Sequence, residues 1–250
     1  MNIATFISAN DNSFNLLHHW FQHYRQEGVT GFHLVVDDNS PDPTKLESLA
    51  PLLRAPDVTI IKTIRGYLSG DERADIINDY KTAELGTCEY VLTTDSDEFV
   101  RAPLRLAERM REDGLDYVQG IYVDRFALNG ETRAIEREES IFKTFPLCAN
   151  FSYEALGANF LRTPMARPSL RYISCNHLVR DFDRFKTAHW KVMVHHFKWT
   201  EGVISNIRSR LKRGFGSKLY QDECTLFLEK FADGDQRVNL KEVFTWVDSF

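Results

Sequence analysis

The sequence has few cysteines, and they are far apart. Its four cysteines, Cys88, Cys148, Cys175 and Cys224, form no CxxC pair among 250 residues. Neither a zinc knuckle nor a thiol redox motif is therefore indicated. Sparse, unpaired cysteines are typical of proteins in a reducing compartment.

Long apolar runs and a basic excess are also missing. No run approaches the roughly 20 apolar residues that cross a bilayer, and MNIATFISANDN at the N-terminus reaches polar residues too early for a signal peptide. The formal net charge of −5 argues against a dedicated nucleic-acid binder, which is usually basic. We therefore expect a cytoplasmic protein with no nucleic-acid partner.

The first hundred residues show a regular alternation. Apolar runs at 3–8, 32–36 and 58–64 predict strands, and the segments between them carry apolar residues at helical spacing. This alternation indicates βαβ units and a mostly parallel sheet.

The pattern changes after residue 100. A helix is predicted near 104–110, followed by strands at 116–123, 140–147, 170–175 and 190–197 that indicate a mixed or antiparallel sheet. Helical spacing returns at 203–211, 224–231 and 240–247. We expect an α/β fold with a mixed sheet flanked by helices, as a single domain over 1–250 with segments 1–100, 101–200 and 201–250, the last one helical.

Residues 90–100 read YVLTTDSDEFV and place three carboxylates after an apolar strand. Buried carboxylates are costly without a cationic partner, and ligands of open α/β sheets bind at this end of the strands. Asp95 and Asp97 can reach one hard cation, and carboxylates suit Mg²⁺ or Mn²⁺ bound together with substrate phosphates. The alternatives are a solvated polar strand end and an aspartyl nucleophile. An EF-hand loop is excluded because Phe99 and Val100 occupy ligand and glycine positions.

Four stretches together resemble GT-A glycosyltransferases of the family 2 type, in particular the bacterial subgroup with a DxDEF metal motif. They are residues 3–10, VVDDNS at 35–40, DERADIINDYKTAEL at 71–85 with the following TTDSDEF, and VHHFKWTEGVISNIRSRLKRG at 194–214. The resemblance implies a nucleotide-binding half in 1–100 and an acceptor half in 101–200. It implies hexosyl transfer with inversion, in polysaccharide or glycoconjugate synthesis.

The resemblance also implies roles on the donor side. Ser8 and Ala9 would lie beside the nucleotide, and Asp38 would accept a hydrogen bond from its base. Arg73 would approach the donor sugar or phosphates, although a solvated helix face is the alternative. The implied donor is a UDP- or GDP-linked sugar.

The metal motif has its own implied roles. Asp97 would bind the ion, with Asp95 on the ion, its waters or the donor, while Glu98 is interpreted as a structural acid. His196 is a candidate third metal ligand through a neutral imidazole, and Lys198 would add charge at the diphosphate. His195 is expected on the opposite face of the strand from His196.

The acceptor side is less defined. Glu154 and His177 are candidates for the base that takes the acceptor proton, and Asp124 is a further one. The acceptor would be a carbohydrate or a lipid-linked hydroxyl. The basic run from Arg208 to Lys218 leaves open peripheral contact with the inner face of a membrane.

The sequence thus predicts a metal-dependent glycosyltransferase. A nucleotidyltransferase is one alternative, although ANDNSFN lacks the glycine-rich basic loop that such an enzyme would prefer. A phosphotransferase using Asp95 as nucleophile is a second. A non-catalytic carbohydrate-binding protein on the same scaffold is a third.

Overall fold

The computed structural model describes residues 1–8, 13–38, 44–66, 68–159, 161–214 and 216–248. Within it the chain divides into two compact units. The first unit consists of residues 1–121 and 161–194, and the second of residues 122–160 and 195–250. The expected single domain with three sequential segments stays a prediction.

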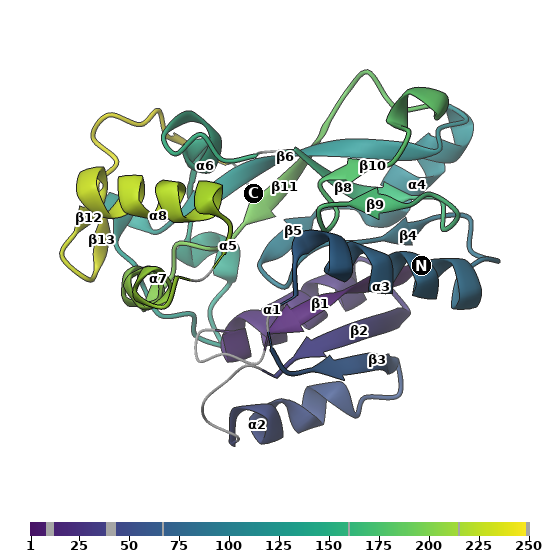
Figure 1. The fold of residues 1–250 in the computed structure, drawn as a ribbon, viewed down its shortest axis with the longest axis horizontal. Coiled ribbons are helices and arrows are strands. Elements are labelled where there is room, and N and C mark those ends of the chain that lie inside the picture. The colour runs from purple at the N-terminus through teal and green to yellow at the C-terminus, as the bar shows by residue number, and fades with distance from the viewer. Residues whose placement is uncertain (9–12, 39–43, 67, 160, 215, 249–250) are drawn as a thin grey trace. The chain divides into compact units, whose positions relative to one another are not determined.

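Parallel strands form the first half of the first unit. β1 (Asn2–Ser8) pairs in parallel with β2 (Gly31–Asp37) and β4 (Val91–Leu92), and β2 pairs in parallel with β3 (Val58–Ile64). Figure 1 shows β1, β2 and β3 as neighbouring arrows that point the same way. The parallel arrangement expected from the βαβ alternation is confirmed.

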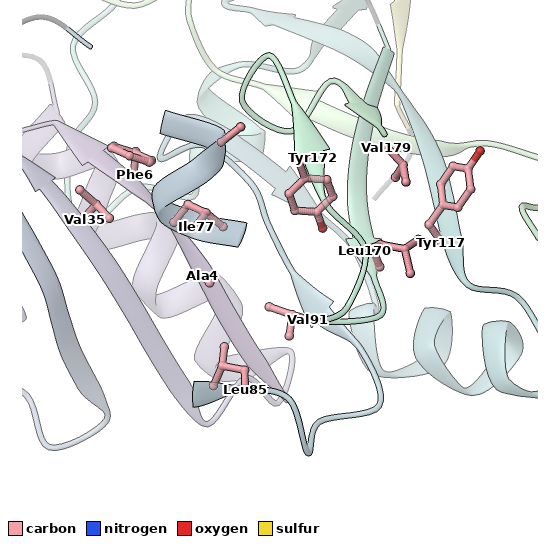
Figure 2. Close-up of a cluster of buried hydrophobic side chains, with 12 residues drawn as sticks. Ala4, Phe6, Val35, Ile77, Leu85, Val91, Tyr117, Leu170, Tyr172 and Val179 are labelled. Atoms are coloured by element: carbon pink, nitrogen blue, oxygen red, sulfur yellow. The ribbon is translucent and has the colours of Figure 1, made fainter. Parts of the chain in front are cut away.

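Helices cover both faces of these strands. On α1 (Ser13–Gln26), the ring of Trp20 lies 5.6 Å from that of Phe32 in β2. On α3 (Gly70–Glu84), Ile77 packs with Phe6 and Val35 (Figure 2). Phe32 and Val35 are three residues apart on one strand, so their side chains lie on opposite faces. A third helix, α2 (Thr44–Leu53), connects β2 to β3.

Antiparallel pairing completes the first unit. β8 (Leu161–Ala166) pairs antiparallel with β4 and with residues 117–121 of β6 (Tyr117–Phe126). β9 (Tyr172–Ile173) and β10 (Leu178–Val179) form a short hairpin. The remaining elements of the first unit are β5 (Glu98–Val100), α4 (Pro103–Glu112) and the short turn η2 (Phe182–Arg184), and β11 (Val192–His196) contributes residues to both units.

The second unit is smaller and mostly antiparallel. The end of β6 pairs with β7 (Leu147–Ala149), which pairs with β14 (Trp246–Val247). Its core gathers aromatic side chains, among them Phe126, Phe151, Trp199 and Phe227. The other elements are η1 (Leu128–Gly130), α5 (Ile141–Thr144), α6 (Phe151–Glu154), α7 (Val203–Lys212), α8 (Lys218–Lys230), β12 (Ala232–Asp233) and β13 (Arg237–Val238).

Two predicted elements are wrong. The strand expected at 140–147 is a single helical turn, α5, followed by Pro146 and β7. The helix expected at 240–247 is a loop that ends in β14, because Trp246 and Val247 pair with Cys148 and Leu147. Short apolar runs do not discriminate helix from strand, and tertiary pairing overrides the local pattern.

The mixed α/β class with flanking helices is confirmed, and α7 and α8 are the helices expected near the C-terminus. In the described part of the chain, no helix combines the length and the apolar character that crossing a membrane requires.

One buried cation lies in the first unit. The side chain of Lys81 on α3 has no exposed surface, and its Nζ donates to the carbonyl oxygen of Leu170 at 3.0 Å. The same Nζ lies 3.5 Å from the ring centroid of Tyr172. Burial, assisted by the charge of Arg171, lowers the pKa of Lys81 to about 7.

This burial predicts that stability depends on pH. An unfolded lysine has a pKa of about 10.4, so between about pH 7 and 10 the unfolded chain holds a proton that the folded chain lacks. The free energy of unfolding should therefore rise with pH across this window, by at most about 1.4 kcal/mol per unit. Lys81→Met should lose this rise, as measured by urea unfolding at pH 7, 8 and 9. The exposed control Lys62→Met should retain it; equal slopes in both variants would contradict the assignment.

Candidate functional site

Asp95 and Asp97 lie in the tight connection between β4 and β5, and Glu98 is the first residue of β5; we call residues 95–98 the acidic turn. The backbone N–H of Glu98 donates to the carbonyl oxygen of Asp95 at 3.0 Å. In return, Oε2 of Glu98 accepts the backbone N–H of Asp95 at 3.0 Å. The Glu98 side chain thus holds the acidic turn through a hydrogen bond to its own backbone.

A buried ion pair anchors the acidic turn. Nε of Arg162 on β8 donates to Oε1 of Glu98 at 2.9 Å, and both side chains are almost completely buried. The guanidinium also contacts Nδ1 of His177. On the other side of β5, the hydroxyl of Tyr24 donates to the Glu98 carbonyl oxygen at 3.0 Å and accepts the N–H of Val100 at 2.9 Å. This geometry agrees with the interpretation of Glu98 as a structural acid.

Asp95 sits in an unfavourable electrostatic environment for a carboxylate. Burial raises its pKa to about 7, and the negative charges of Glu98 and Asp97 add to this, while the guanidinium of Arg73 acts in the opposite direction. A cation bound beside Asp95 would restore its ionised form, because opposite charge favours the charged state. The donor set of Asp95 and Asp97 therefore fits a hard divalent ion.

Asp95 opens onto a small pocket in the first unit. Its lining includes Phe6 of β1, Arg73 of α3, and Cys175 and Asn176 from the turn between β9 and β10. The cavity measures about 20 Å³, which is room for a water molecule or an ion. A nucleotide would need a much larger space, so this pocket alone does not hold one.

Arg73 is placed in this pocket by the start of α3. Ser69 caps the helix, and Ser69 and Glu72 form a capping box in which each side chain binds the other's backbone N–H. The Arg73 guanidinium then lies over the ring of Phe6, 4.6 Å from its centroid. The structure therefore brings Arg73 and Asp95 together, rather than placing Arg73 only on a solvated helix face.

The turn after β9 completes the pocket with strained backbone. Ser174 and Cys175 both have left-handed φ angles, 51° and 63°, which non-glycine residues adopt at a cost. The backbone N–H of Ser174 donates to Oδ1 of Asp71, and that of Cys175 to the carbonyl oxygen of Gly70. Sequence reasoning missed this turn, because no local signal in ISCNH marks two consecutive left-handed residues.

The sulfur of Cys175 is not poised as a nucleophile. Burial, with a contribution from the negative charge of Asp95, raises the pKa of the Cys175 thiol to about 11. The thiol is therefore protonated at neutral pH, and the thiolate is the reactive form.

The predicted nucleotide-side residues lie at the same edge of the parallel strands. Ser8 ends β1 and pairs in register with Asp37 of β2, and Asp38 follows directly. Asp38 accepts a hydrogen bond from Nε of Arg65 at 2.9 Å. Because β1 and β4 are parallel, the acidic turn follows β4 at this edge too. Ala9 lies outside the described residues.

In the second unit, Asp124 is the centre of a buried hydrogen-bond network. Its carboxylate accepts from the backbone N–H and the hydroxyl of Ser152, at 2.6 and 2.9 Å, and from Nε1 of Trp199 at 3.0 Å. It also accepts from Nδ1 of His196 at 2.9 Å. Burial acts to raise the pKa of Asp124, but the hydrogen bonds and the charge of His196 outweigh it, so the net pKa is lowered.

The predicted residues on β11 belong to this network or lie beside it. The His196 ring stacks on Tyr122 at 4.4 Å between centroids, and its Nδ1 is bound to Asp124. His195, also buried, accepts from Nε of Arg125 at 3.2 Å, so the two histidines contact different groups. Nζ of Lys198 lies 4.9 Å from the Trp199 ring centroid. The diphosphate role of Lys198 stays a prediction.

Shared metal ligation by Asp97 and His196 also stays a prediction, since Asp97 belongs to the first unit and His196 to the second. Within the described ranges, no three His, Cys, Asp or Glu side chains gather as a metal-binding group. An ion at the acidic turn would take its other ligands from substrate phosphates and water, as Mg²⁺ usually does.

The two base candidates differ in their surroundings. Glu154 is exposed on α6 and accepts from Nδ2 of Asn150 at 3.2 Å. Burial, together with the charge of Arg162, lowers the pKa of His177 to about 3. His177 is therefore neutral and weakly basic at physiological pH, and its Nδ1 already contacts Arg162. Both base assignments stay predictions, and the geometry favours neither.

The basic run of the second unit is largely engaged within the chain. Arg208 pairs with Asp235, Arg210 donates to the hydroxyl of Tyr220 at 2.9 Å, and Lys218 pairs with Asp222. Peripheral membrane contact through this run stays a prediction.

Comparison with known proteins gives little beyond these observations. A scan against protein-family models finds no match, and a search of curated proteins finds none. Among solved structures, the chain is similar to the crystal structure of S. aureus TarS 1–349, with 15% sequence identity and a TM-score of 0.38 over 91% of this chain and 71% of that chain. A likeness at this level carries no argument about activity.

The buried pair of Glu98 and Arg162 yields a stability prediction. Arg162→Met should lower the free energy of unfolding by about 3–5 kcal/mol, because it leaves a buried carboxylate unpaired. The double variant Glu98→Gln/Arg162→Met should lose less than Arg162→Met alone, since no buried charge remains. Urea unfolding measures both. The partly exposed control Arg171→Met should change stability by less than about 1 kcal/mol. The single variant Glu98→Gln completes the cycle. If the loss of stability in the double variant equals the sum of the losses in Glu98→Gln and Arg162→Met, the pairing is refuted.

The network around Asp124 yields a second prediction. Asp124→Asn places an amide N–H₂ among groups that all donate, so at least one buried donor loses its acceptor. We expect a loss of about 3 kcal/mol in the free energy of unfolding, measured by denaturant unfolding. Asp222→Asn, at an exposed i,i+4 pair, is the matched control and should be near neutral. Equal effects of the two substitutions would show that the network contributes no stability.

Proposed function

We propose that the protein is a metal-dependent glycosyltransferase that moves a sugar from a nucleotide-sugar donor to an acceptor hydroxyl. The observation that carries this proposal is the acidic turn at the carboxyl edge of the parallel strands, where Asp95 has a raised pKa next to Asp97 and Arg73. Open α/β sheets bind ligands at that edge. The resemblance of the DxDEF stretch to family 2 GT-A enzymes supports the same assignment.

The proposed roles follow from the chemistry of the turn. Asp97 and Asp95 would hold Mn²⁺ or Mg²⁺, which supplies charge neutralisation for the departing diphosphate. Glu98 and Arg162 hold the turn in place. Arg73 supplies a cation in the same pocket, where it favours a phosphate or sugar-phosphate group.

The donor side is assigned by position. Asp38, just after the end of β2, would accept a hydrogen bond from the base of a UDP- or GDP-linked sugar. Because Arg65 already donates to the Asp38 carboxylate, Arg65 would have to share that carboxylate with the base or release it. Arg65 is mostly exposed but the Asp38 side chain is buried, so the N–H of the base would have to replace the hydrogen bond that Arg65 gives up. The acceptor would be a carbohydrate or a lipid-linked hydroxyl, with inverting hexosyl transfer in polysaccharide or glycoconjugate synthesis.

Donor binding and slow donor hydrolysis test this proposal. Across a panel of UDP- and GDP-sugars, at least one should bind in the presence of Mn²⁺ and be hydrolysed slowly without an acceptor. Asp97→Ala should reduce both by at least about 100-fold, which corresponds to roughly 2.7 kcal/mol.

Asp113→Ala, at an exposed carboxylate on the last turn of α4, is the matched control and should behave as the wild type. The absence of binding to every donor, or binding unaffected by Asp97→Ala, would contradict the proposal. Binding without hydrolysis would favour the non-catalytic carbohydrate-binding alternative, and a trapped phospho-aspartate at Asp95 would favour the phosphotransferase.

A further inference from the structure

A second and larger concavity lies within the second unit. We call it the polar cleft, and it is lined by residues 131–133, residues 201, 202 and 205, and residues 233 and 235–237. Its volume is about 520 Å³, within the range of sites for small organic ligands. It shares no residue with the acidic turn or its pocket.

Backbone hydrogen bonds hold the walls of the polar cleft together. The N–H of Thr132 donates to the carbonyl oxygen of Gln236 at 2.8 Å, and the N–H of Glu201 to that of Arg133 at 2.9 Å. Glu131 and Arg237 form an antiparallel bridge. Three segments far apart in the sequence are thus joined into one frame. The cleft is therefore preformed, which lowers the ordering cost of binding.

The chemistry of the lining indicates the class of ligand. Four carboxylates, from Glu131, Glu201, Asp233 and Asp235, face two guanidiniums, an amide and two hydroxyls, and no aromatic or large apolar side chain is among the lining residues. Such a mixture of acceptors and donors suits hydroxyl groups, each of which both donates and accepts. With Arg208, which pairs with Asp235, the four carboxylates still outnumber three guanidiniums, and this disfavours a phosphorylated or otherwise anionic ligand.

The ion pairs at the rim are loose enough to exchange with a ligand. Arg237 lies 4.0 Å from Glu131, and Arg133 lies 3.9 Å from Glu139, with all four side chains about half exposed. Exposed pairs at this distance contribute little. Both guanidiniums can therefore turn toward a ligand at small cost.

An independent observation comes from Thr132. This residue is 93% buried, and its Oγ1 has no hydrogen-bond partner among the described residues. Buried hydroxyls are nearly always satisfied in folded proteins. Thr132 belongs to the lining of the polar cleft, and a rotation of its side chain would bring the buried Oγ1 to a ligand hydroxyl or a bound water there.

We propose that the polar cleft binds a neutral polyhydroxylated ligand, an oligosaccharide of two or three residues. The carboxylates and guanidiniums form paired hydrogen bonds with sugar hydroxyls, and Thr132 contributes one more when its side chain rotates toward the cleft. The proposal rests on the cleft alone and goes beyond the proposed donor chemistry, so either can fail without the other.

Saturation-transfer NMR and calorimetry on the full chain test the proposal. The probes are neutral oligosaccharides (maltotriose, cellotriose, mannotriose and N,N′-diacetylchitobiose), with glucose 6-phosphate and chitosan trimer as anionic and cationic comparisons. At least one neutral probe should bind better than both charged ones. Glu201→Gln/Arg237→Gln should weaken its affinity by about tenfold, as expected for lost hydrogen bonds to charged groups.

Thr132→Val is the second variant, because it keeps the volume and removes only the hydroxyl. It should fold as the wild type does and bind the neutral probe several-fold more weakly. Glu229→Gln/Arg213→Gln, exposed elsewhere in the same unit, is the matched control and should leave binding unchanged.

Three results would overturn the proposal. The first is that no neutral probe binds, even at a probe concentration 20-fold above a dissociation constant of about 1 mM, which we take as that of a weak sugar site. The second is a preference for either charged probe. The third is binding that survives Glu201→Gln/Arg237→Gln but is lost in Asp97→Ala, which would place the sugar at the acidic turn instead.

Discussion

The ion pair between Glu98 and Arg162 is the interaction on which the proposed donor site depends. One carboxylate accepts both the guanidinium of β8 and the backbone N–H of Asp95. Glu98 therefore ties the acidic turn both to β8 and to its own backbone. A buried pair of this kind gives little net stability, but here it holds the backbone of the turn that carries Asp95 and Asp97. Asp95 carries the electrostatic cost, because burial raises its pKa and the negative charge of Glu98 raises it further.

The surroundings of the turn are assembled from distant segments. α3 supplies Arg73 and the N-terminal groups to which the strained turn at 174–175 is hydrogen-bonded. Asn176 donates to the carbonyl oxygen of Thr93 at 2.8 Å, so the same turn also supports the chain just before the acidic turn. The left-handed backbone of Ser174 and Cys175 is thus held by hydrogen bonds to the start of α3 and to the chain just before the acidic turn. Strained backbone that is held in this way is characteristic of ligand sites.

The second unit is organised around Asp124 instead. In the part of the chain that the structure describes, no lysine or arginine is among the hydrogen-bond donors of this buried carboxylate, which is stabilised by a histidine, a tryptophan, a hydroxyl and a backbone N–H. The network fixes the ring of His196 and packs it on Tyr122. Asp124 was one of three base candidates, and its carboxylate is fully buried within this network.

Local patterns in the sequence predicted the parallel strands well, because buried strands with helices between them leave a strong signal. They also predicted the acidic turn and the structural place of Glu98. They did not predict that Arg162 would pair with Glu98, since the partner lies 64 positions away. They failed at 140–147 and 240–247, where pairing with distant strands decides the structure. The turn at 174–175 and the polar cleft arise only when separate segments meet, and no single stretch carries their signal.

The central claim is that the acidic turn binds a divalent ion together with a nucleoside diphosphate. Anomalous diffraction from crystals grown with Mn²⁺ and UDP or GDP tests it directly. The account predicts a manganese peak within bonding distance of the Asp97 carboxylate, with a phosphate oxygen of the nucleotide in the same coordination shell. A nucleotide bound without the ion, or a manganese peak away from Asp95 and Asp97, would contradict it.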